Sequence, residues 1–267
     1  MTINPSPISP LFLEKNPEYK VIQVTSPEVF VANHIPKAIH IAPSELVSGV
    51  PPASGRLPEL EQLTKTFTRI GYDPSQTYVV CDDEGGGWAG RMAWTLDVIG
   101  HQSWKYLDGG LHAWASAGLS FESGSTQTTP DVTTVELTLQ NQPIAEISDI
   151  LPRLGNEDLV VWDCRSYEEF IGQRTASARA GHIPGALHLD WLKLMDPDNG
   201  LSLVKNIDEL LHSNGITKEK DIITHCQTHH RSGLAYMAAR LLGYKRIRAY
   251  HGSWSEWGNR SDTPVEL

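Results

Sequence analysis

The chain contains one long internal repeat, which limits its fold more than any other feature of the sequence. Shifted by 143 residues, VVCDDEGGGWAGRMAWTLDVIGHQSWKYLDGGLHAWASAG (79–118) aligns without a gap with IITHCQTHHRSGLAYMAARLLGYKRIRAYHGSWSEWGNRS (222–261), so that Gly90 matches Gly233. HIPKAIHI (34–41) matches HIPGALHL (182–189) at a shift of 148. Each copy runs beyond about 100 residues, which is the size of a domain rather than of a solenoid repeat.

The stretch between the copies, SGSTQTTPDVTTVELTLQNQP (123–143), has no helical period and is rich in Ser, Thr and Gln. Such a composition is typical of a linker. We therefore predict a first domain at 1–124, a linker at 125–143 and a second domain at 144–267.

Within each copy, short β-rich runs alternate with helical ones. In the second copy LVVWDC (159–164) and DIITH (221–225) read as strands, and GLAYMAARLLG (233–243) reads as a helix. Apolar strands separated by helices predict an α/β fold, with a mostly parallel sheet covered by helices on both faces in each domain. In such folds the active crevice lies beyond the carboxyl ends of the strands. Cys226 follows one of these ends.

Composition narrows the function classes. Hydrophobic residues make up 40% of the chain and charged residues 20%, as in globular proteins. The net charge of −10 argues against a nucleic-acid partner, and no apolar run is long enough to span a bilayer. The first residues do not resemble a signal peptide, so we expect a cytoplasmic monomer. Three cysteines without C-x-x-C spacing are expected to be reduced thiols.

The segment THCQTHHRSG (224–233) places a cysteine between a strand and a helix. A loop before a helix presents backbone N–H groups and the positive end of the helix dipole, which together bind anions and stabilise a thiolate. His229, His230 and Arg231 would add positive charge nearby. These effects lower a cysteine pKa, so Cys226 is predicted to be a nucleophile.

The HIPGA segment, the cysteine-centred loop and the ending GSWSEWGNRSDTPVE (252–266) resemble tandem-domain rhodaneses, which are sulfurtransferases; the loop CQTHHRS is a form found in bacterial members. This resemblance implies that Cys226 takes the outer sulfur of a small anionic donor, becomes a persulfide and passes the sulfur to cyanide or a thiol, including the thiol of a protein. It implies no cofactor beyond this covalent intermediate, and no metal is expected. The loop residues predicted to bind the sulfur donor are Gln227, Thr228, His229, His230, Arg231 and Ser232.

The first copy has no such nucleophile. The gapless alignment places Asp83 opposite Cys226 and EGGGWA opposite QTHHRS, so that the basic residues are lost as well. We therefore predict an inactive N-terminal domain that forms one wall of the cleft, through Trp88, with Asp83 as a helix N-cap.

Further residues are expected to support the site. By resemblance, Arg179 binds the sulfur donor, with Arg174 as the alternative, while Asp163 holds the neighbouring loops and Arg165 in place. Trp191 lines the cleft or packs within it.

The remaining candidates read as structural. Cys164 is predicted to be a core thiol, with a redox partnership with Cys226 as the alternative, and Cys81 a core thiol. His182 recurs as His34 in the inactive copy and therefore predicts a turn-stabilising hydrogen bond. His225 should point away from the nucleophile.

Other functions stay open. His225-Cys226-x4-Arg231-Ser232 is one residue shorter than the HCx5RS signature of tyrosine phosphatases, which makes a smaller cradle. A persulfide carrier would show the same residues. Relatives acting on 3-mercaptopyruvate tend to carry a CGSGVT-type loop, and the animal thiosulfate enzymes carry CRKGVT. The basic loop of this chain favours a compact anion, so thiosulfate is the first expectation and 3-mercaptopyruvate the second.

Overall fold

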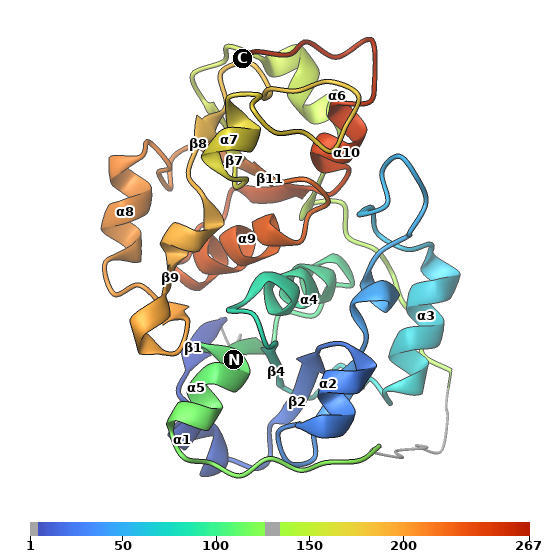
Figure 1. Cartoon of the computed structure of the whole chain (residues 1–267). Coiled ribbons are helices and arrows are strands. Elements are labelled where there is room, and N and C mark those ends of the chain that lie inside the picture. The colour runs from blue at the N-terminus through green and yellow to red at the C-terminus, as the bar shows by residue number, and fades with distance from the viewer. Residues whose placement is uncertain (1–4, 126–133) are drawn as a thin grey trace.

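The computed structural model describes residues 5–125 and 134–267, and in these ranges the chain forms two five-stranded parallel sheets (Figure 1). The N-terminal sheet has the order β1 (Ser6–Ile8), β5 (Trp104–Leu107), β4 (Tyr78–Cys81), β2 (Lys20–Val24), β3 (Ile39–Ile41). The C-terminal sheet has the order β6 (Ile144–Ala145), β12 (Ile247–Tyr250), β11 (Asp221–His225), β7 (Leu159–Asp163), β8 (Leu187–His188). The two orders are equivalent, and the predicted α/β fold with two similar domains is confirmed.

Helices cover both faces of each sheet. The outer face of the N-terminal sheet carries α1 (Pro10–Glu14), α2 (Pro27–Ala32) and α5 (Gly110–Ser116), and that of the C-terminal sheet carries α6 (Ile147–Ile150), α7 (Tyr167–Phe170) and α10 (Ser253–Trp257). Between the two sheets lie α3 (Leu60–Arg69), α4 (Gly87–Val98), α8 (Ile207–Ser213) and α9 (Arg231–Leu241). A small antiparallel hairpin, β9 (Met195–Asp196) with β10 (Ser202–Leu203), projects from the C-terminal half.

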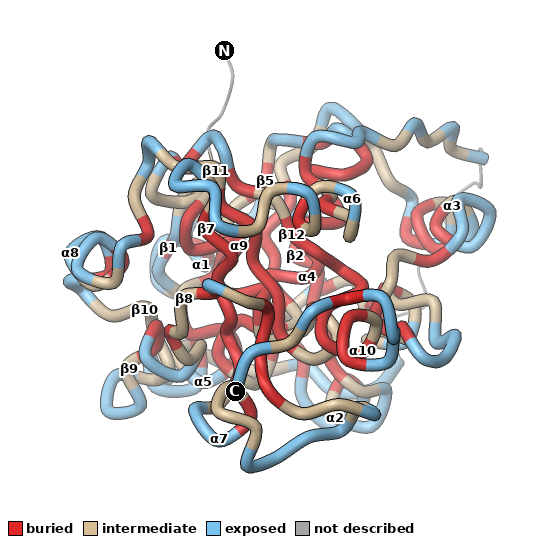
Figure 2. The backbone as a smooth tube through the Cα atoms, turned by 90° about the horizontal axis from the view of Figure 1, so that it is seen from above, coloured by how far each residue is buried: buried red, intermediate tan, exposed pale blue. Residues whose placement is uncertain are grey.

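The largest of the three hydrophobic clusters is shared by both halves. It contains the inner faces of both sheets and nearly all of α4, which is buried all round. In Figure 2 the buried backbone runs continuously through the middle of the molecule. Because one apolar cluster joins the halves, their separation would expose the core of each.

Helices α4 and α9 cross with their backbones in contact at Gly90 and Gly233. A Cβ atom on Gly90 would lie 2.3 Å from the carbonyl carbon of Gly233, and one on Gly233 would lie 2.6 Å from the amide nitrogen of Arg91. The glycines matched in the repeat are therefore required by the contact between the copies, since any side chain would separate the two helices.

The second half of the predicted linker packs on the protein. Residues 126–133 of that prediction lie outside the described residues. Beyond them Val135, Leu137 and Leu139 contact the shared core, and the Gln140 amide donates to the Val98 carbonyl at 2.7 Å. The alternating apolar residues of VELTLQ explain this contact.

Gly90→Ala tests the helix contact. Its methyl group would overlap the backbone of Gly233, so we expect the free energy of unfolding to fall by about 1–3 kcal/mol. Urea unfolding followed by circular dichroism measures the change. Ala115→Ser, at an exposed position of α5, is the control and should unfold like the unaltered protein; equal stability of Gly90→Ala would show that the helices are free to move apart.

Candidate active site

Cys226 is the first residue after β11, where the sheet register places it at the carboxyl edge. The last register pair joins Asp163 of β7 to His225 of β11. The Cys226 amide donates to the Ser253 hydroxyl at 3.3 Å, and its carbonyl accepts from the Trp254 amide at 3.0 Å. Both ends of its peptide group are thereby fixed, and the side chain is fully buried.

The sulfur atom lies in a cradle formed by the loop and the first turn of α9. Burial alone would raise the pKa of Cys226, but the charge of Arg231, the Ser232 hydroxyl and the amides of Ser232 and Thr228 outweigh burial and lower it. The thiolate is therefore favoured. This arrangement matches the predicted anion cradle, and its contribution to binding a sulfur donor stays a proposal.

His229 belongs to the cradle as a neutral ring, which corrects the positive charge expected for it. The ring is fully buried against Trp94, and burial together with the charge of Arg91 lowers its pKa well below the usual value. Its Nδ1 lies 2.8 Å from the Ser232 hydroxyl. By this contact His229 orients the Ser232 hydroxyl, which helps to lower the pKa of Cys226.

His230 joins the catalytic loop to the inactive loop. Its Nε2 contacts the Glu84 carboxylate, and its ring packs between Trp88, at 4.5 Å, and Trp191, at 5.7 Å between ring centroids. Burial lowers the pKa of His230, but the bond to Glu84 outweighs burial and raises it. Both predicted cleft tryptophans thus lie against the loop.

Arg231 is held by a carboxylate that the sequence did not single out. Its guanidinium donates to both oxygens of Glu169, at 2.5 and 2.9 Å. Burial lowers the pKa of Arg231, but the bond to Glu169 raises it above its ordinary value. Arg231 therefore stays charged beside Cys226.

The inactive loop is one residue longer than the gapless alignment implied, which corrects the assignment of Asp83. The Asp82 carbonyl accepts from the Leu111 amide at 2.9 Å, as that of Cys226 accepts from Trp254, so Asp82 is the equivalent of Cys226. The Asp82 carboxylate accepts from the amides of Glu84, Gly86 and Ala89. Asp83 is not an N-cap: Gly86 precedes α4 without a side-chain bond.

Asp163 anchors the loop before HIPGA. Its carboxylate binds the Arg165 guanidinium at 2.6–3.0 Å, and Arg165 also donates to the Gly181 carbonyl at 2.8 Å. His225 lies 3.6 Å from the same carboxylate, on the opposite side of the strand from Cys226, as predicted. Burial lowers the pKa of His225 to about 4.

Arg179 does not face the loop, although the resemblance assigned it to the sulfur donor. Its guanidinium donates to the carbonyls of Thr263, at 2.6 Å, and Trp257, at 2.8 Å, and to the Thr263 hydroxyl at 2.6 Å. These bonds tie the C-terminal segment to α10, so we assign Arg179 to that packing. Arg174 is exposed and stays a prediction.

Gln227 and Thr228 are placed by neighbouring segments. The Gln227 amide donates to the Ser177 hydroxyl at 3.1 Å. The Thr228 carbonyl lies directly under Gly55, where a Cβ atom would come within 2.0 Å of it. The N-terminal half is therefore in close backbone contact with the catalytic loop.

The residues predicted to be structural are buried, and their contacts agree with that prediction. Cys81 and Cys164 are free, fully buried thiols, and burial raises the pKa of both well above the usual value. Nδ1 of His34 and of His182 each lies 2.8 Å from the carbonyl of a phenylalanine, Phe30 or Phe170, on whose ring it stacks. Because the contact is the same in both copies, it explains why the inactive copy retains this histidine although it lacks the cysteine.

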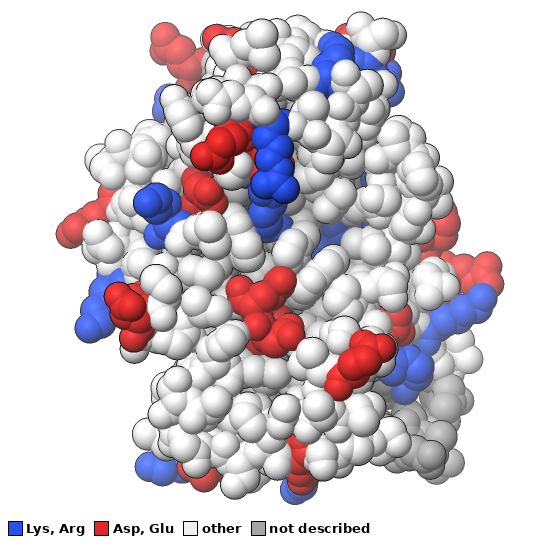
Figure 3. Space-filling model, in the orientation of Figure 1, with Lys and Arg blue, Asp and Glu red and all other residues white. Residues whose placement is uncertain are grey.

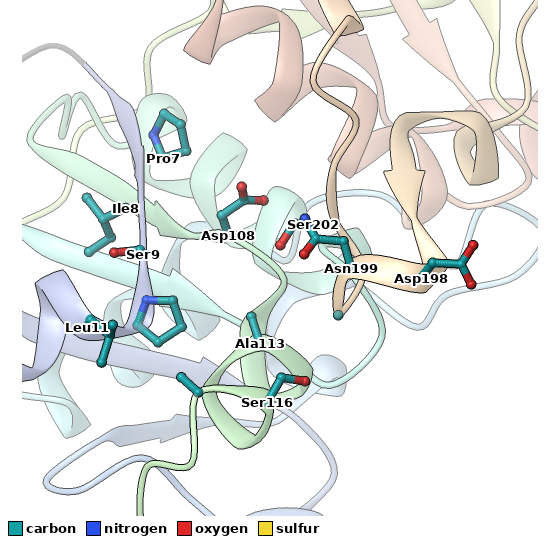
Figure 4. Close-up of a pocket in the computed structure, with 13 residues that line it drawn as sticks. Pro7, Ile8, Ser9, Leu11, Asp108, Ala113, Ser116, Asp198, Asn199 and Ser202 are labelled. Carbon is teal, nitrogen blue, oxygen red and sulfur yellow. The ribbon is translucent and has the colours of Figure 1, made fainter.

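The hollow beside the N-terminal strand offers a small anion less than the Cys226 loop. A hollow of about 480 Å³ lies between the N-terminal strand and residues 198–202 (Figure 4), and its charged lining residues are Asp108 and Asp198. Acidic and basic side chains are interspersed on the face in Figure 3 without a continuous basic patch. In residues 5–125 and 134–267 no three potential metal ligands cluster, and no helix there has the length and apolar character needed to cross a membrane.

Several important residues were missed: Gly55, Asp82, Glu84, Arg91 and Glu169. Four of them lie in the inactive half, which was predicted to contribute only Trp88 to the site because it has no nucleophile. A one-residue gap in the alignment would have found Asp82.

Glu84→Gln tests the link between the loops. The raised pKa of His230 means that this pairing stabilises fully below the ordinary histidine pKa and is lost as pH rises through the raised pKa. We expect a loss of about 0.5 kcal/mol between about pH 5 and 6.5, and almost none above pH 8. Chemical denaturation across this range measures it; a loss independent of pH would contradict the pairing.

Cys164→Val tests the two interpretations of that thiol. Cys164 follows the β7 residue paired with His225 and shares the core cluster of Cys226. As a core thiol it should be replaceable with less than about 1.5 kcal/mol of destabilisation. After one sulfur atom is loaded, intact mass should be equally stable with and without Cys164. Spontaneous loss of that sulfur as sulfide, with an internal disulfide, only when Cys164 is present would favour the redox partnership.

The comparisons with known proteins agree with the two-domain organisation of the chain. The model of the rhodanese-like domain matches residues 12–117 and 147–260. The chain is 47% identical to a thiosulfate sulfurtransferase of Azotobacter vinelandii, over 94% of this chain and 92% of the relative, and 45% identical to one of Pseudomonas aeruginosa, over 100% and 97%. It is 30% identical to the sulfur carrier protein TtuD of Thermus thermophilus, over 77% and 76%.

Among solved structures, the anaerobic ergothioneine biosynthesis enzyme from Chlorobium limicola superposes with a TM-score of 0.82 at 24% identity. The match covers 93% of this chain and 64% of that longer chain, and it shows the shared fold alone.

Proposed function

The chain belongs to the rhodanese-like family, and from this premise we propose that it is a thiosulfate sulfurtransferase. The observation that carries the proposal is the buried Cys226 sulfur, whose pKa is lowered by Arg231, Ser232 and Thr228 against the effect of burial. A thiolate of this kind is a strong nucleophile, and the groups that stabilise it also suit an anionic sulfur donor.

The first step loads the sulfur. The Cys226 thiolate attacks the outer sulfur of thiosulfate, the sulfur–sulfur bond of the donor breaks, and its electron pair leaves with sulfite. The product is a cysteine persulfide whose terminal sulfur is negative. The amides of Thr228 and Ser232, the Ser232 hydroxyl and the Arg231 charge stabilise this anion as they stabilise the thiolate.

The second step returns the thiolate. Cyanide or a thiolate attacks the outer sulfur of the persulfide and leaves with it, while the electron pair of the broken bond returns to Cys226. His230, Trp88 and Trp191 surround the loop at this point. We propose that they set the size of the acceptor. Both halves of the site come from one chain, so a monomer suffices, and three free thiols suit a reducing cytoplasm.

Thiosulfate is proposed over 3-mercaptopyruvate because the loop is short and Arg231 keeps its positive charge beside Cys226. Arg231 remains charged and the first turn of α9 follows at once. A compact dianion gains more from such a site than a larger monoanion.

A sulfur carrier is the second candidate, favoured by the similarity to TtuD. A carrier would form the same persulfide but release it only to a protein partner. A phosphatase is disfavoured because the shorter loop encloses a smaller anion.

Cys226→Ala tests the reaction. We expect the unaltered protein to form thiocyanate from thiosulfate and cyanide over many turnovers, and the variant to form none, because the covalent step needs the thiolate. Colorimetric thiocyanate assay measures this. Activity that survives the substitution would refute the mechanism, and a single turnover by the unaltered protein would favour the carrier.

A panel of donors followed by intact mass identifies the substrate. Thiosulfate should add one sulfur atom, which cyanide removes, whereas aryl phosphate should leave the mass unchanged. Arg231→Ala should reduce kcat/KM for thiosulfate about 10²-fold, because it removes a charge beside the reacting sulfur. Arg246→Ala, at an exposed position, is the control. A greater gain of mass from 3-mercaptopyruvate would reverse the choice of donor.

A further inference from the structure

Arg91 is a fully buried cation of the inactive half that touches the catalytic loop. It lies on α4, and its Nη1 donates to the Gly55 carbonyl at 2.7 Å and, at 3.5 Å, to the carbonyl of His229. Its Nη2 donates to the Leu46 carbonyl at 2.6 Å, and its Nε has no partner. Three carbonyl groups therefore hold the guanidinium without neutralising it.

The other arginines at or near the interface have carboxylate partners. Arg165, equally buried, is bound by Asp163, while Arg231 is paired with Glu169 and Arg240 with Asp97. In the part of the chain that the structure describes, Arg91 forms no ion pair with a carboxylate. A buried cation is strongly destabilising unless an anion balances it.

The acidic group that acts on the charge of Arg91 is the Cys226 thiol. Burial lowers the pKa of Arg91 to about 9, and the thiolate acts in the opposite direction. Arg91 also fixes the loop through Gly55, which lies against the Thr228 carbonyl. The other titratable groups that act on Cys226 are Arg231 and His230, with Cys164 beside it; those facing Arg91 are His229 and His251.

We propose that Arg91 is a positioning residue for the reaction: its bonds to the carbonyls of Gly55 and His229 hold the loop in the conformation that forms the cradle, and its charge, which no carboxylate of the described residues pairs, favours the Cys226 thiolate and persulfide. The inactive half thereby supplies part of the charge that the nucleophile needs. The persulfide part of this inference rests on the proposed function; the thiolate part does not.

The inactive loop provides an internal comparison. The repeat places Leu234 opposite Arg91, and Leu234 packs against Gly86 of the inactive loop. There residues 83–87, which follow Asp82, include no arginine, and burial, followed by the charge of Glu84, raises the pKa of Asp82 to about 6. The pKa of Cys226 moves the other way. The two cradles therefore differ in the charge that acts on them: Arg231 lowers the pKa of Cys226, whereas Glu84 raises that of Asp82.

The test separates charge from hydrogen bonding. Arg91→Gln keeps N–H groups that can donate to the carbonyls and removes the charge. Arg91→Lys keeps the charge and loses the two separate guanidinium nitrogens that donate to Gly55 and Leu46. In each full-length variant, the rate of Cys226 alkylation by iodoacetamide is followed against pH. We expect about tenfold slower alkylation near pH 7 in Arg91→Gln, from a raised apparent thiol pKa, and a nearly unaltered profile in Arg91→Lys.

Two controls make the outcome decisive. Arg240→Gln removes another interface arginine and should lower stability without moving the profile. Cys226→Ala should show no labelling, since burial raises the pKa of Cys81 and Cys164 well above the usual value and keeps both as unreactive thiols. An unaltered profile in Arg91→Gln, or equal shifts in Arg91→Gln and Arg91→Lys, would overturn the charge role. Loss of the proposed function is a separate outcome: the unaltered protein would then form no thiocyanate.

A second measurement needs no Arg91 variant. If the thiolate balances Arg91, Cys226→Ser should lower the unfolding midpoint at alkaline pH. The lowered pKa of Cys226 means that this stabilisation is present above the ordinary thiol pKa and is lost as pH falls through the lowered one. The difference between the two proteins should therefore shrink in acid. A difference that stays constant with pH would overturn the proposal.

Discussion

The backbone contact between α4 and α9 at Gly90 and Gly233 is the constraint on which the site depends. Because no side chain separates the helices, the loops that precede them also meet. Glu84 then reaches His230, and Gly55 covers Thr228. The catalytic loop is thus enclosed by the other half of the chain, and a C-terminal domain alone would lack these walls.

The groups around Cys226 offset the unfavourable effect of burial on its thiolate. Removal of the sulfur from water disfavours the thiolate, yet the same low-dielectric surroundings strengthen every charge and dipole directed at it. Arg231, itself fixed by Glu169, and the loop amides outweigh the loss of solvent. The Asp82 cradle shows the opposite balance in the same fold. The two loops differ in length by one residue and in the charged side chain beside the buried group, which is Arg231 for Cys226 and Glu84 for Asp82.

The sequence was sufficient to predict the architecture and the place of Cys226 between a strand and a helix, because the repeat, the apolar strand runs and the strand–cysteine–helix order are local patterns. It misplaced Asp83 because glycines fill the inactive loop, and a gap there leaves no trace in the alignment. It assigned Arg179 by resemblance, whereas the fold uses that guanidinium for three carbonyl and hydroxyl acceptors. Arg91 was invisible for another reason: its burial and lack of a carboxylate arise from contacts with segments far away in sequence.

The paired glycines also bear on the origin of the chain. The matched residues Gly90 and Gly233 contact each other, as equivalent residues can in the isologous interface of a symmetric dimer. In a homodimer both subunits have the same sequence, so the position of Arg91 and Leu234 would have to be the same residue in both. An arginine at that position would then replace the leucine in both subunits. Fusion of two copies into one chain releases this restriction. Arg91 and Leu234 could then differ, and the N-terminal half could hold a residue that contacts the catalytic loop of the other half.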